Sequence, residues 1–217
     1  MLVSHKYKFI YIKSIKTAGT STEIYLEPYC ISNIVESHGR EMIQTKEGIV
    51  GTRMNQALAE KSEFYNHMPP KKIIESIGKD IFDSYTKIIN VRNPFDMMVS
   101  HYYFKPTFDL YASGEMTFED YLLKTNVVKD LSKKYWDLMY VDGQFIIDEV
   151  VRFENLESDI NNLLIKLNLP NPTRVLSEYK KNKRRPDKNW EKMYSSETKN
   201  LVETHFKFYF DLFNYEF

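Results

Sequence analysis

The sequence has few of the features expected for an oxidising compartment, a membrane or a nucleic acid partner. It contains a single cysteine, Cys30, which excludes an intrachain disulfide. No apolar run is long enough to span a bilayer, and the first residues lead into a strand-like segment instead of the apolar core of a signal peptide. Lys and Arg together number 30, as do Asp and Glu, which argues against broad binding of a nucleic acid polymer. These absences predict a cytoplasmic protein in which any anion site is a local concentration of charge.

The sequence does contain enough apolar material for one full core. Of its 217 residues 42% are hydrophobic and 15% are aromatic, and no internal repeat is visible, so we expect a single domain over residues 1–217. Strand-like and helix-like segments alternate, which predicts an α/β fold of the P-loop NTPase type, with a central parallel sheet flanked by helices. The predicted strands are 8–13, 49–51, 85–91 and 149–153, and the predicted helices are 19–28, 70–77, 94–104, 117–124, 156–167 and one that starts near Ser196.

A turn rich in small and hydroxylated residues follows the first of these strands. Its residues are Lys16, Thr17, Ala18, Gly19, Thr20 and Ser21. A strand that leads through such a turn into a helix presents backbone N–H groups and the positive end of the helix dipole to an anion. The hydroxyls of Thr17, Thr20 and Ser21 can each donate a hydrogen bond, and Lys16 adds a positive charge. The turn is therefore a candidate phosphate loop, although an ordinary strand-to-helix turn with hydroxyl caps would use the same residue types.

The order of residues in this turn excludes the usual ATP-binding loop. A Walker-type loop carries its lysine directly after the last glycine, and a further glycine stands at the start of the motif. Here Lys16 precedes Gly19, and the earlier glycine is missing. The turn is therefore expected to bind a phosphate group of a different kind of ligand.

A second candidate phosphate site follows the strand predicted at 85–91. Arg92 leaves that strand, Asn93 is a helix cap, and Pro94 is the first residue of the next helix. Ser100 lies almost two turns further, roughly 10 Å along the axis, so an arginine and a serine hydroxyl can converge on one phosphate. The alternative is a capped helix in which the arginine only pairs with a carboxylate. Because ligands of such sheets bind beyond the carboxyl ends of the strands, we expect both motifs at one edge.

The two motifs together resemble those of the sulfotransferases that use 3′-phosphoadenosine 5′-phosphosulfate (PAPS). The run Lys16–Ser21 is similar to the family's 5′-phosphosulfate loop, and it departs from the pattern at Lys13, where histidine is common, and at Ile15, where proline is usual. The run that starts Arg92-Asn-Pro-Phe-Asp and continues to Ser100 is similar to the 3′-phosphate motif. Residues 152–156 and the chain end at 210–217 also look like family segments, the last one like carbohydrate sulfotransferases.

The resemblance implies an activity, a donor and roles for the site residues. It implies transfer of a sulfuryl group from PAPS to an acceptor hydroxyl, with a glycan as the expected acceptor. No metal is expected, because the sequence has no Cys/His cluster and no paired-aspartate loop. Lys16 would stabilise the charge that grows on the leaving phosphate, and Arg92 with Ser100 would hold the 3′-phosphate. The residues that would hold the 5′-phosphate are Lys16, Thr17, Ala18, Gly19, Thr20 and Ser21.

The acceptor hydroxyl must lose a proton, and histidine is the usual base near neutral pH. His67 stands just before the helix predicted at 70–77. This layout resembles that of carbohydrate 2-O-sulfotransferases and their bacterial relatives, which have a catalytic histidine in that place. We therefore expect His67 to be the base. His38, beside Glu36 in the irregular and polar segment 29–68, is the alternative.

A basic run at residues 180–188 contains Lys183, Arg184 and Arg185. It would be a solvated loop in most proteins, but the matching loop of the sulfotransferases folds over the nucleotide. We therefore expect these three residues to contact the donor or an anionic acceptor.

Two other functions remain open on the sequence. The first is a P-loop kinase or NTPase, because its fold would be the same; the order of residues around Lys16 and the lack of a clear magnesium aspartate argue against it. The second is a nucleotide-binding module of the same fold that has lost catalysis. The departures at Lys13 and Ile15 leave room for such a module, whereas the retained Lys16 argues against it.

Overall fold

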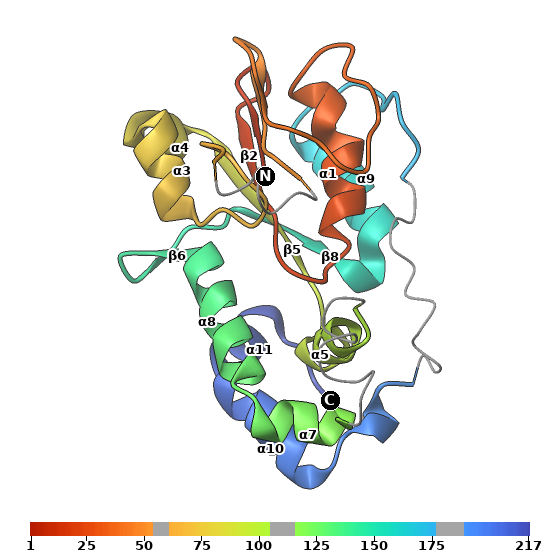
Figure 1. Ribbon diagram of the computed structural model, residues 1–217. Coiled ribbons are helices and arrows are strands. Elements are labelled where there is room, and N and C mark those ends of the chain that lie inside the picture. Colours follow the sequence, from red (N-terminus) through yellow and green to blue (C-terminus); the bar gives the residue numbers. More distant parts are fainter. Residues whose placement is uncertain (54–60, 105–115, 177–188) are drawn as a thin grey trace. The chain divides into compact units, whose positions relative to one another are not determined.

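The computed structural model describes residues 1–53, 61–104, 116–176 and 189–217 (Figure 1). The chain divides into two compact units, which we describe separately. The first consists of Met1–Val91 and Asp137–Tyr179, and the second of Arg92–Trp136 and Lys180–Phe217. That residues 1–217 act as one sulfotransferase domain stays a prediction.

The first unit is built on a six-stranded mixed sheet with the order β3-β4-β1-β2-β5-β8. The strands β2, β5 and β8 run parallel to one another, and β1, β3 and β4 join the sheet in antiparallel pairs. The expected central parallel sheet is therefore confirmed for β2, β5 and β8, whereas β1, β3 and β4 make the rest of the sheet antiparallel. The strands are β1 Leu2–Ser4, β2 Phe9–Ile12, β3 Ile43–Gln44, β4 Gly48–Val50, β5 Thr86–Val91 and β8 Glu149–Arg152.

The antiparallel half follows from a hairpin at the start of the chain. The turn at residues 5–8 joins β1 to β2, and so short a connection allows only antiparallel pairing. The strand predicted at 8–13 corresponds to β2, whereas β1 was missed because three residues carry no readable period. Since β2 and β5 are parallel neighbours, their carboxyl ends at Ile12 and Val91 lie at the same edge of the sheet.

Helices cover both faces of this sheet. Figure 1 shows α1 and α9 on one face and α3 and α4 on the other. Their bounds are α1 Gly19–Leu26, α3 Pro70–Ile77, α4 Lys79–Ser84 and α9 Leu156–Lys166. On the α1 and α9 face, strand residues such as Tyr11, Ile88 and Val151 pack with Leu26 and Leu163 into one buried cluster. A separate hairpin, β6 Tyr140–Val141 and β7 Gln144–Phe145, also belongs to this unit.

The second unit is helical in its described part. Its helices are α5 Pro94–Tyr102, α7 Phe118–Lys124, α10 Ser196–His205 and α11 Lys207–Phe213, and α8 Val127–Met139 begins in this unit and ends in the first. The cap predicted for α5 is confirmed, because the Asn93 side chain accepts a hydrogen bond from the Phe95 N–H. The single last helix is instead two, which are separated at Phe206. Phe95 anchors the packing, and its ring stacks on Trp190 at 5.6 Å between centroids.

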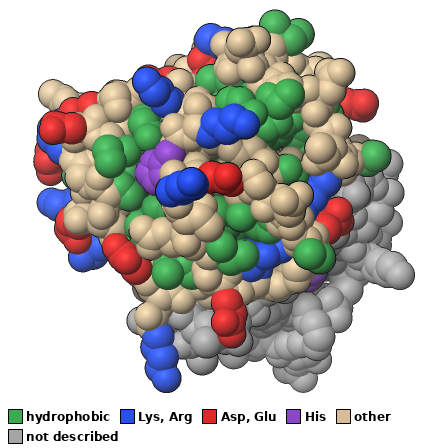
Figure 2. Space-filling model, turned by 90° about the horizontal axis from the view of Figure 1, so that it is seen from above, with side chains coloured by type: hydrophobic (Ala, Val, Ile, Leu, Met, Phe, Trp, Pro, Cys, Tyr) green, Lys and Arg blue, Asp and Glu red, His purple; other side chains and the backbone are tan. Residues whose placement is uncertain are grey.

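The surface carries charges of both signs. On the face seen in Figure 2, the Lys and Arg side chains lie among acidic and apolar ones and form no single basic patch. In the described parts of the chain, no helix combines the length and the apolar character needed to cross a membrane.

Candidate functional site

The candidate phosphate loop runs from the end of β2 at Ile12 to the start of α1 at Gly19. Lys16 and Ala18 have positive φ angles of 60° and 61°, whereas Thr17 between them keeps a negative φ. Backbone that alternates in hand in this way turns successive N–H groups toward one concave side, which is a known anion-binding geometry. Left-handed backbone is unfavourable for residues with a side chain, so the neighbouring structure must hold it. The local backbone thus has the form that a phosphate loop requires.

Gly19 is required because the chain packs against itself at this point. A Cβ on Gly19 would lie 3.0 Å from Cγ of Lys13, 3.2 Å from the carbonyl oxygen of Ser14 and 3.2 Å from the hydroxyl of Tyr11. Its φ is not positive, so the requirement is for space rather than for a special backbone angle. The glycine allows the two ends of the loop to approach each other.

The hydroxyl of Thr17 is used inside the loop. Ser14 Oγ donates its only proton to the carbonyl oxygen of Asn90 at 2.5 Å. In the 2.6 Å contact between Ser14 Oγ and Thr17 Oγ1, Thr17 must therefore be the donor. Thr17 is fully buried. In this structure the Thr17 hydroxyl already donates to Ser14. The backbone N–H is therefore the group of Thr17 that stays a candidate for contact with a phosphate.

The remaining residues of the loop stay candidates for phosphate contact. Thr20 and Ser21 are 6% and 3% exposed and belong to the first turn of α1. Lys16 is partly exposed, as a residue that meets a ligand must be. These three side chains and the loop N–H groups are what the turn can offer to an anion.

His67 is hydrogen-bonded to Lys13, the first residue after β2. Its Nδ1 atom lies 3.0 Å from the carbonyl oxygen of Lys13, and because a carbonyl only accepts, Nδ1 must carry the proton. The lone pair of the ring is then on Nε2, which is the tautomer that a general base needs. Burial, together with the charge of Lys13, lowers the pKa of His67 to about 3, so the ring is neutral at pH 7. For the alternative base His38, the contact seen is through its backbone carbonyl, which accepts from Arg53 Nε at 2.9 Å.

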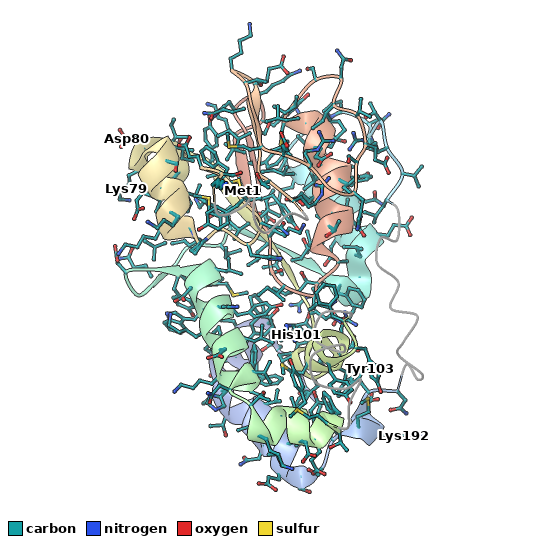
Figure 3. All side chains as sticks on the ribbon, viewed as in Figure 1. Met1, Lys79, Asp80, His101, Tyr103 and Lys192 are labelled. Carbon is teal, nitrogen blue, oxygen red and sulfur yellow. The ribbon has the colours of Figure 1, made fainter. Side chains whose placement is uncertain are left out.

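A buried network of charges lies behind the loop, and sequence reasoning missed it. Glu23, fully buried on α1, accepts from Lys13 Nζ at 2.7 Å, from Arg53 Nη1 at 3.0 Å and from the Met1 amine at 2.6 Å. Arg53 also reaches Glu27 at 2.6 Å. Figure 3 shows Met1 among the strands of this unit. Burial raises the pKa of Glu23, but Lys13, the Met1 amine and Arg53 outweigh it and hold the pKa well below its usual range.

This network explains the departure from the family pattern at Lys13. Lys13 is 2% exposed, and its ammonium group faces Glu23 in the protein interior. Burial lowers the pKa of Lys13, and the attraction of Glu23 opposes that shift. Lys13 therefore acts through its partners: its side chain is bound to Glu23 and its carbonyl to His67. The sequence did contain a sign of this buried ion pair, because Lys13 is a charged residue directly after an apolar strand.

The arginine motif belongs to the second unit and pairs with a carboxylate. Arg92 donates from Nε to Asp96 Oδ2 at 2.7 Å, and its Nη2 lies 2.6 Å from the same oxygen. Both residues are largely buried, at 7% and 9% exposure. This is the pairing considered as the alternative, and it holds one edge of the guanidinium in a fixed orientation. The backbone N–H of Arg92 donates to the Tyr209 hydroxyl at 3.1 Å, and Ser100 lies further along α5 at 8% exposure.

Three of the predicted cofactor residues, Lys183, Arg184 and Arg185, lie outside the described residues. Their contact with the donor stays a prediction from the sequence. The expectation that no metal takes part stays a prediction as well.

Comparisons with known proteins agree with these motifs. A family model described as "Sulfotransferase family" matches residues 1–216. An uncharacterized protein of Archaeoglobus fulgidus is 31% identical over 105 residues, which cover 48% of this chain and 84% of the relative. No solved structure matches the chain. Because the family match extends over nearly the whole sequence, including both motifs, the chain belongs to the sulfotransferase family and is an enzyme of that family.

Proposed function

We propose that this sulfotransferase moves the sulfuryl group of PAPS to a glycan hydroxyl, with His67 as the base. The observation that carries the proposal is the loop before α1, in which the backbone alternates in hand around Thr17 and Lys16 precedes Gly19. That backbone suits a phosphate group, and the position of the lysine differs from that in ATP-binding loops. Sulfotransferases generally use PAPS, which bears such a phosphate next to the group that is transferred.

The loop is assigned to the 5′-phosphate of the donor. Backbone N–H groups from Thr17 to Ser21 and the hydroxyls of Thr20 and Ser21 supply hydrogen bonds, and α1 adds the positive end of its dipole. Lys16 supplies a full charge from a partly exposed position. These groups match the negative charge and the acceptor oxygens of a phosphate.

Arg92 and Ser100 are assigned to the 3′-phosphate. Asp96 binds the Nε and Nη2 side of the Arg92 guanidinium and so fixes the orientation of that group. The assignment rests on the similarity of this run to the family's 3′-phosphate motif. It accounts for selection of PAPS over ATP, which lacks that phosphate.

The reaction is proposed as an in-line displacement at sulfur, similar in logic to phosphoryl transfer. His67 Nε2 takes the proton of the acceptor hydroxyl while that oxygen forms a bond to sulfur. The bond between sulfur and the bridging phosphate oxygen breaks, and that oxygen keeps the electron pair. Lys16 stabilises the new negative charge, and the products are a sulfate ester and adenosine 3′,5′-bisphosphate. A pKa of about 3 makes His67 a weak base in the free protein, and the negative charges of a bound donor are expected to raise that pKa.

Isothermal calorimetry with adenosine 3′,5′-bisphosphate tests the donor assignment. The native protein should bind this product much more tightly than AMP, because AMP lacks the 3′-phosphate. Arg92→Ala should weaken binding by about 1.5–3 kcal/mol, the typical worth of a hydrogen bond to a charged group. Equal affinity of the native protein for the bisphosphate and for AMP would overturn the assignment.

A radiolabelled-donor assay over glycans, phenols and peptides tests the acceptor class. Glycans should be labelled preferentially, since the resemblance at His67 and at the chain end is to carbohydrate sulfotransferases. Labelling of phenols or peptides instead would contradict the glycan assignment. Turnover of ATP that depends on magnesium would favour a kinase or NTPase.

A further inference from the structure

Asn90 is a fully buried polar residue at the carboxyl end of β5, and the roles assigned above do not use it. It stands one residue beyond Ile89, which pairs with Ile12 of β2 in the parallel ladder. This register places Asn90 beside the residues where β2 turns into the candidate phosphate loop. A buried amide must find partners for its donors and its acceptor, so its contacts show what it holds.

Within the described part of the chain, the partners of the Asn90 amide belong to the loop or to its two flanking elements. Nδ2 donates to the carbonyl oxygen of Thr17 at 3.1 Å and to Thr22 Oγ1 at 2.9 Å. Oδ1 accepts from the Tyr11 hydroxyl at 2.9 Å. A carbonyl can only accept, so the bond to Thr17 also fixes which end of the amide is the nitrogen. The backbone oxygen of Asn90 adds a fourth link through its bond from Ser14 Oγ.

The bond to the Thr17 carbonyl determines the direction of a neighbouring N–H. The carbonyl of Thr17 and the N–H of Ala18 belong to one trans peptide unit, in which the two groups point in opposite directions. Asn90 draws that carbonyl toward the protein interior, so the Ala18 N–H is turned the other way. The same bond opposes relaxation of the left-handed backbone at Ala18, whose φ is 61°.

We propose that Asn90 is a positioning residue that holds the Ala18 N–H toward the phosphate of the donor. The inference rests on the proposed function, because it assumes that the loop binds that phosphate. Tyr11 and Thr22 hold the amide in place, and the bond from Nδ2 to the Thr17 carbonyl oxygen fixes the orientation of the peptide between Thr17 and Ala18. A residue that only supported the fold would affect stability, whereas Asn90 also determines how well the loop binds an anion.

The decisive variant is Asn90→Asp, which keeps the shape of the side chain and removes both donors. Its carboxylate would repel the Thr17 carbonyl, so affinity for adenosine 3′,5′-bisphosphate should fall tenfold or more and KM for PAPS should rise by a similar factor. Asn162→Asp adds the same charge at an exposed position on α9 and should change neither. Thr22→Val removes an acceptor of Nδ2 but keeps the bond to Thr17, so its affinity should fall less than that of Asn90→Asp.

Tyr11→Phe keeps the experiment decisive if Asn90→Asp does not fold. It removes the 2.9 Å bond from the Tyr11 hydroxyl to Asn90 Oδ1, and with it the longer 3.3 Å contact of that hydroxyl with the Gly19 carbonyl oxygen, without adding charge. Affinity should fall by a factor between those of Thr22→Val and Asn90→Asp. The proposal is overturned if Asn90→Asp binds the bisphosphate within twofold of native, or, where that variant does not fold, if Tyr11→Phe does.

Titration with inorganic phosphate separates failure of this proposal from failure of the proposed function. If the native protein does not bind the bisphosphate, the donor assignment is wrong. The Ala18 amide resonance of the native protein should still shift when inorganic phosphate is added, and that shift should be lost in Asn90→Asp, or in Tyr11→Phe where Asn90→Asp does not fold. A native shift that the variant retains, or no native shift, would overturn the role of Asn90.

Discussion

The Nδ1 atom of His67 donates a hydrogen bond to the carbonyl oxygen of Lys13, the residue that follows the last residue of β2. This contact joins the proposed base to the strand that leads into the phosphate loop. It also fixes the proton on Nδ1 before any substrate is present. The position and the tautomer of the proposed base are thus set by the backbone that leads into the candidate phosphate loop.

His67→Asn should separate the base from its structural role. His67 has a positive φ of 57°, which asparagine tolerates better than most residues, and an asparagine amide can replace Nδ1 as the donor to Lys13. We expect kcat to fall roughly 10²–10⁴-fold, the usual contribution of a general base, while affinity for adenosine 3′,5′-bisphosphate stays close to native. His38→Asn is the control and should retain kcat. A native kcat in His67→Asn, or a larger loss in His38→Asn, would move the base to another residue.

The lowered pKa of His67 also predicts a pH dependence of stability. The folded state holds this pKa at about 3 and the unfolded state near the ordinary 6.5, so only the unfolded state gains a proton as the pH falls between these values. The free energy of unfolding should therefore decrease by up to roughly 1.4 kcal/mol per pH unit in this range from His67 alone. Urea unfolding of the native protein and of His67→Asn at pH 7, 6, 5 and 4.5 measures the difference. Parallel pH profiles for the two proteins would refute the assignment of this pKa.

Glu23→Gln should be strongly destabilising. It removes the carboxylate that compensates Lys13 and Arg53, and loss of one partner from a buried ion pair costs about 3–5 kcal/mol. Glu75→Gln, which breaks an exposed pair with Lys72, is the matched control and should leave the unfolding midpoint unchanged. Chemical denaturation at pH 7 compares the two. Similar midpoints for both variants would mean that the network contributes little.

Two adjacent substitutions in the loop should act in opposite directions. Gly19→Ala places a Cβ 3.0 Å from Lys13 Cγ and 3.2 Å from the Ser14 carbonyl, and such overpacking costs about 1–3 kcal/mol. Ala18→Gly relieves a left-handed residue, worth roughly 1–2 kcal/mol, against an entropy cost of about 0.4–1 kcal/mol in the unfolded chain. We expect it to raise the free energy of unfolding by up to about 1.6 kcal/mol. A higher midpoint of thermal unfolding for Gly19→Ala than for Ala18→Gly would contradict the backbone described for the loop.

Features that depend on a short stretch of sequence were predictable. Pro70 begins α3 and Gly78, with a φ of 86°, ends it, and Asn93 with Pro94 begins α5, all as their local preferences indicate. The turn proposed to bind phosphate was also expected between a strand and a helix, and it lies between β2 and α1. The helix α8 was missed although Val128, Leu131, Tyr135 and Leu138 are buried at helical spacing, so its signal was present.

Features that depend on pairing between distant segments were not predictable. No local pattern indicates that Glu23 pairs with Arg53, or that Asn90 on β5 donates a hydrogen bond to Thr17 in the loop after the neighbouring strand β2. The antiparallel half of the sheet likewise depends on β1, whose three residues are too short to show a period. The use of the Thr17 hydroxyl inside the loop follows only once Ser14 is seen to donate to Asn90.

The hydrogen bonds that hold the loop in its left-handed turns also bear on how fast a donor can bind. Because Ser14, Thr17 and Asn90 already fix the backbone, the conformational entropy of the loop is lost when the chain folds rather than when the ligand arrives. An encounter with an anion then needs no rearrangement of the loop backbone. The association rate is therefore expected to show no slow phase from ordering of this loop.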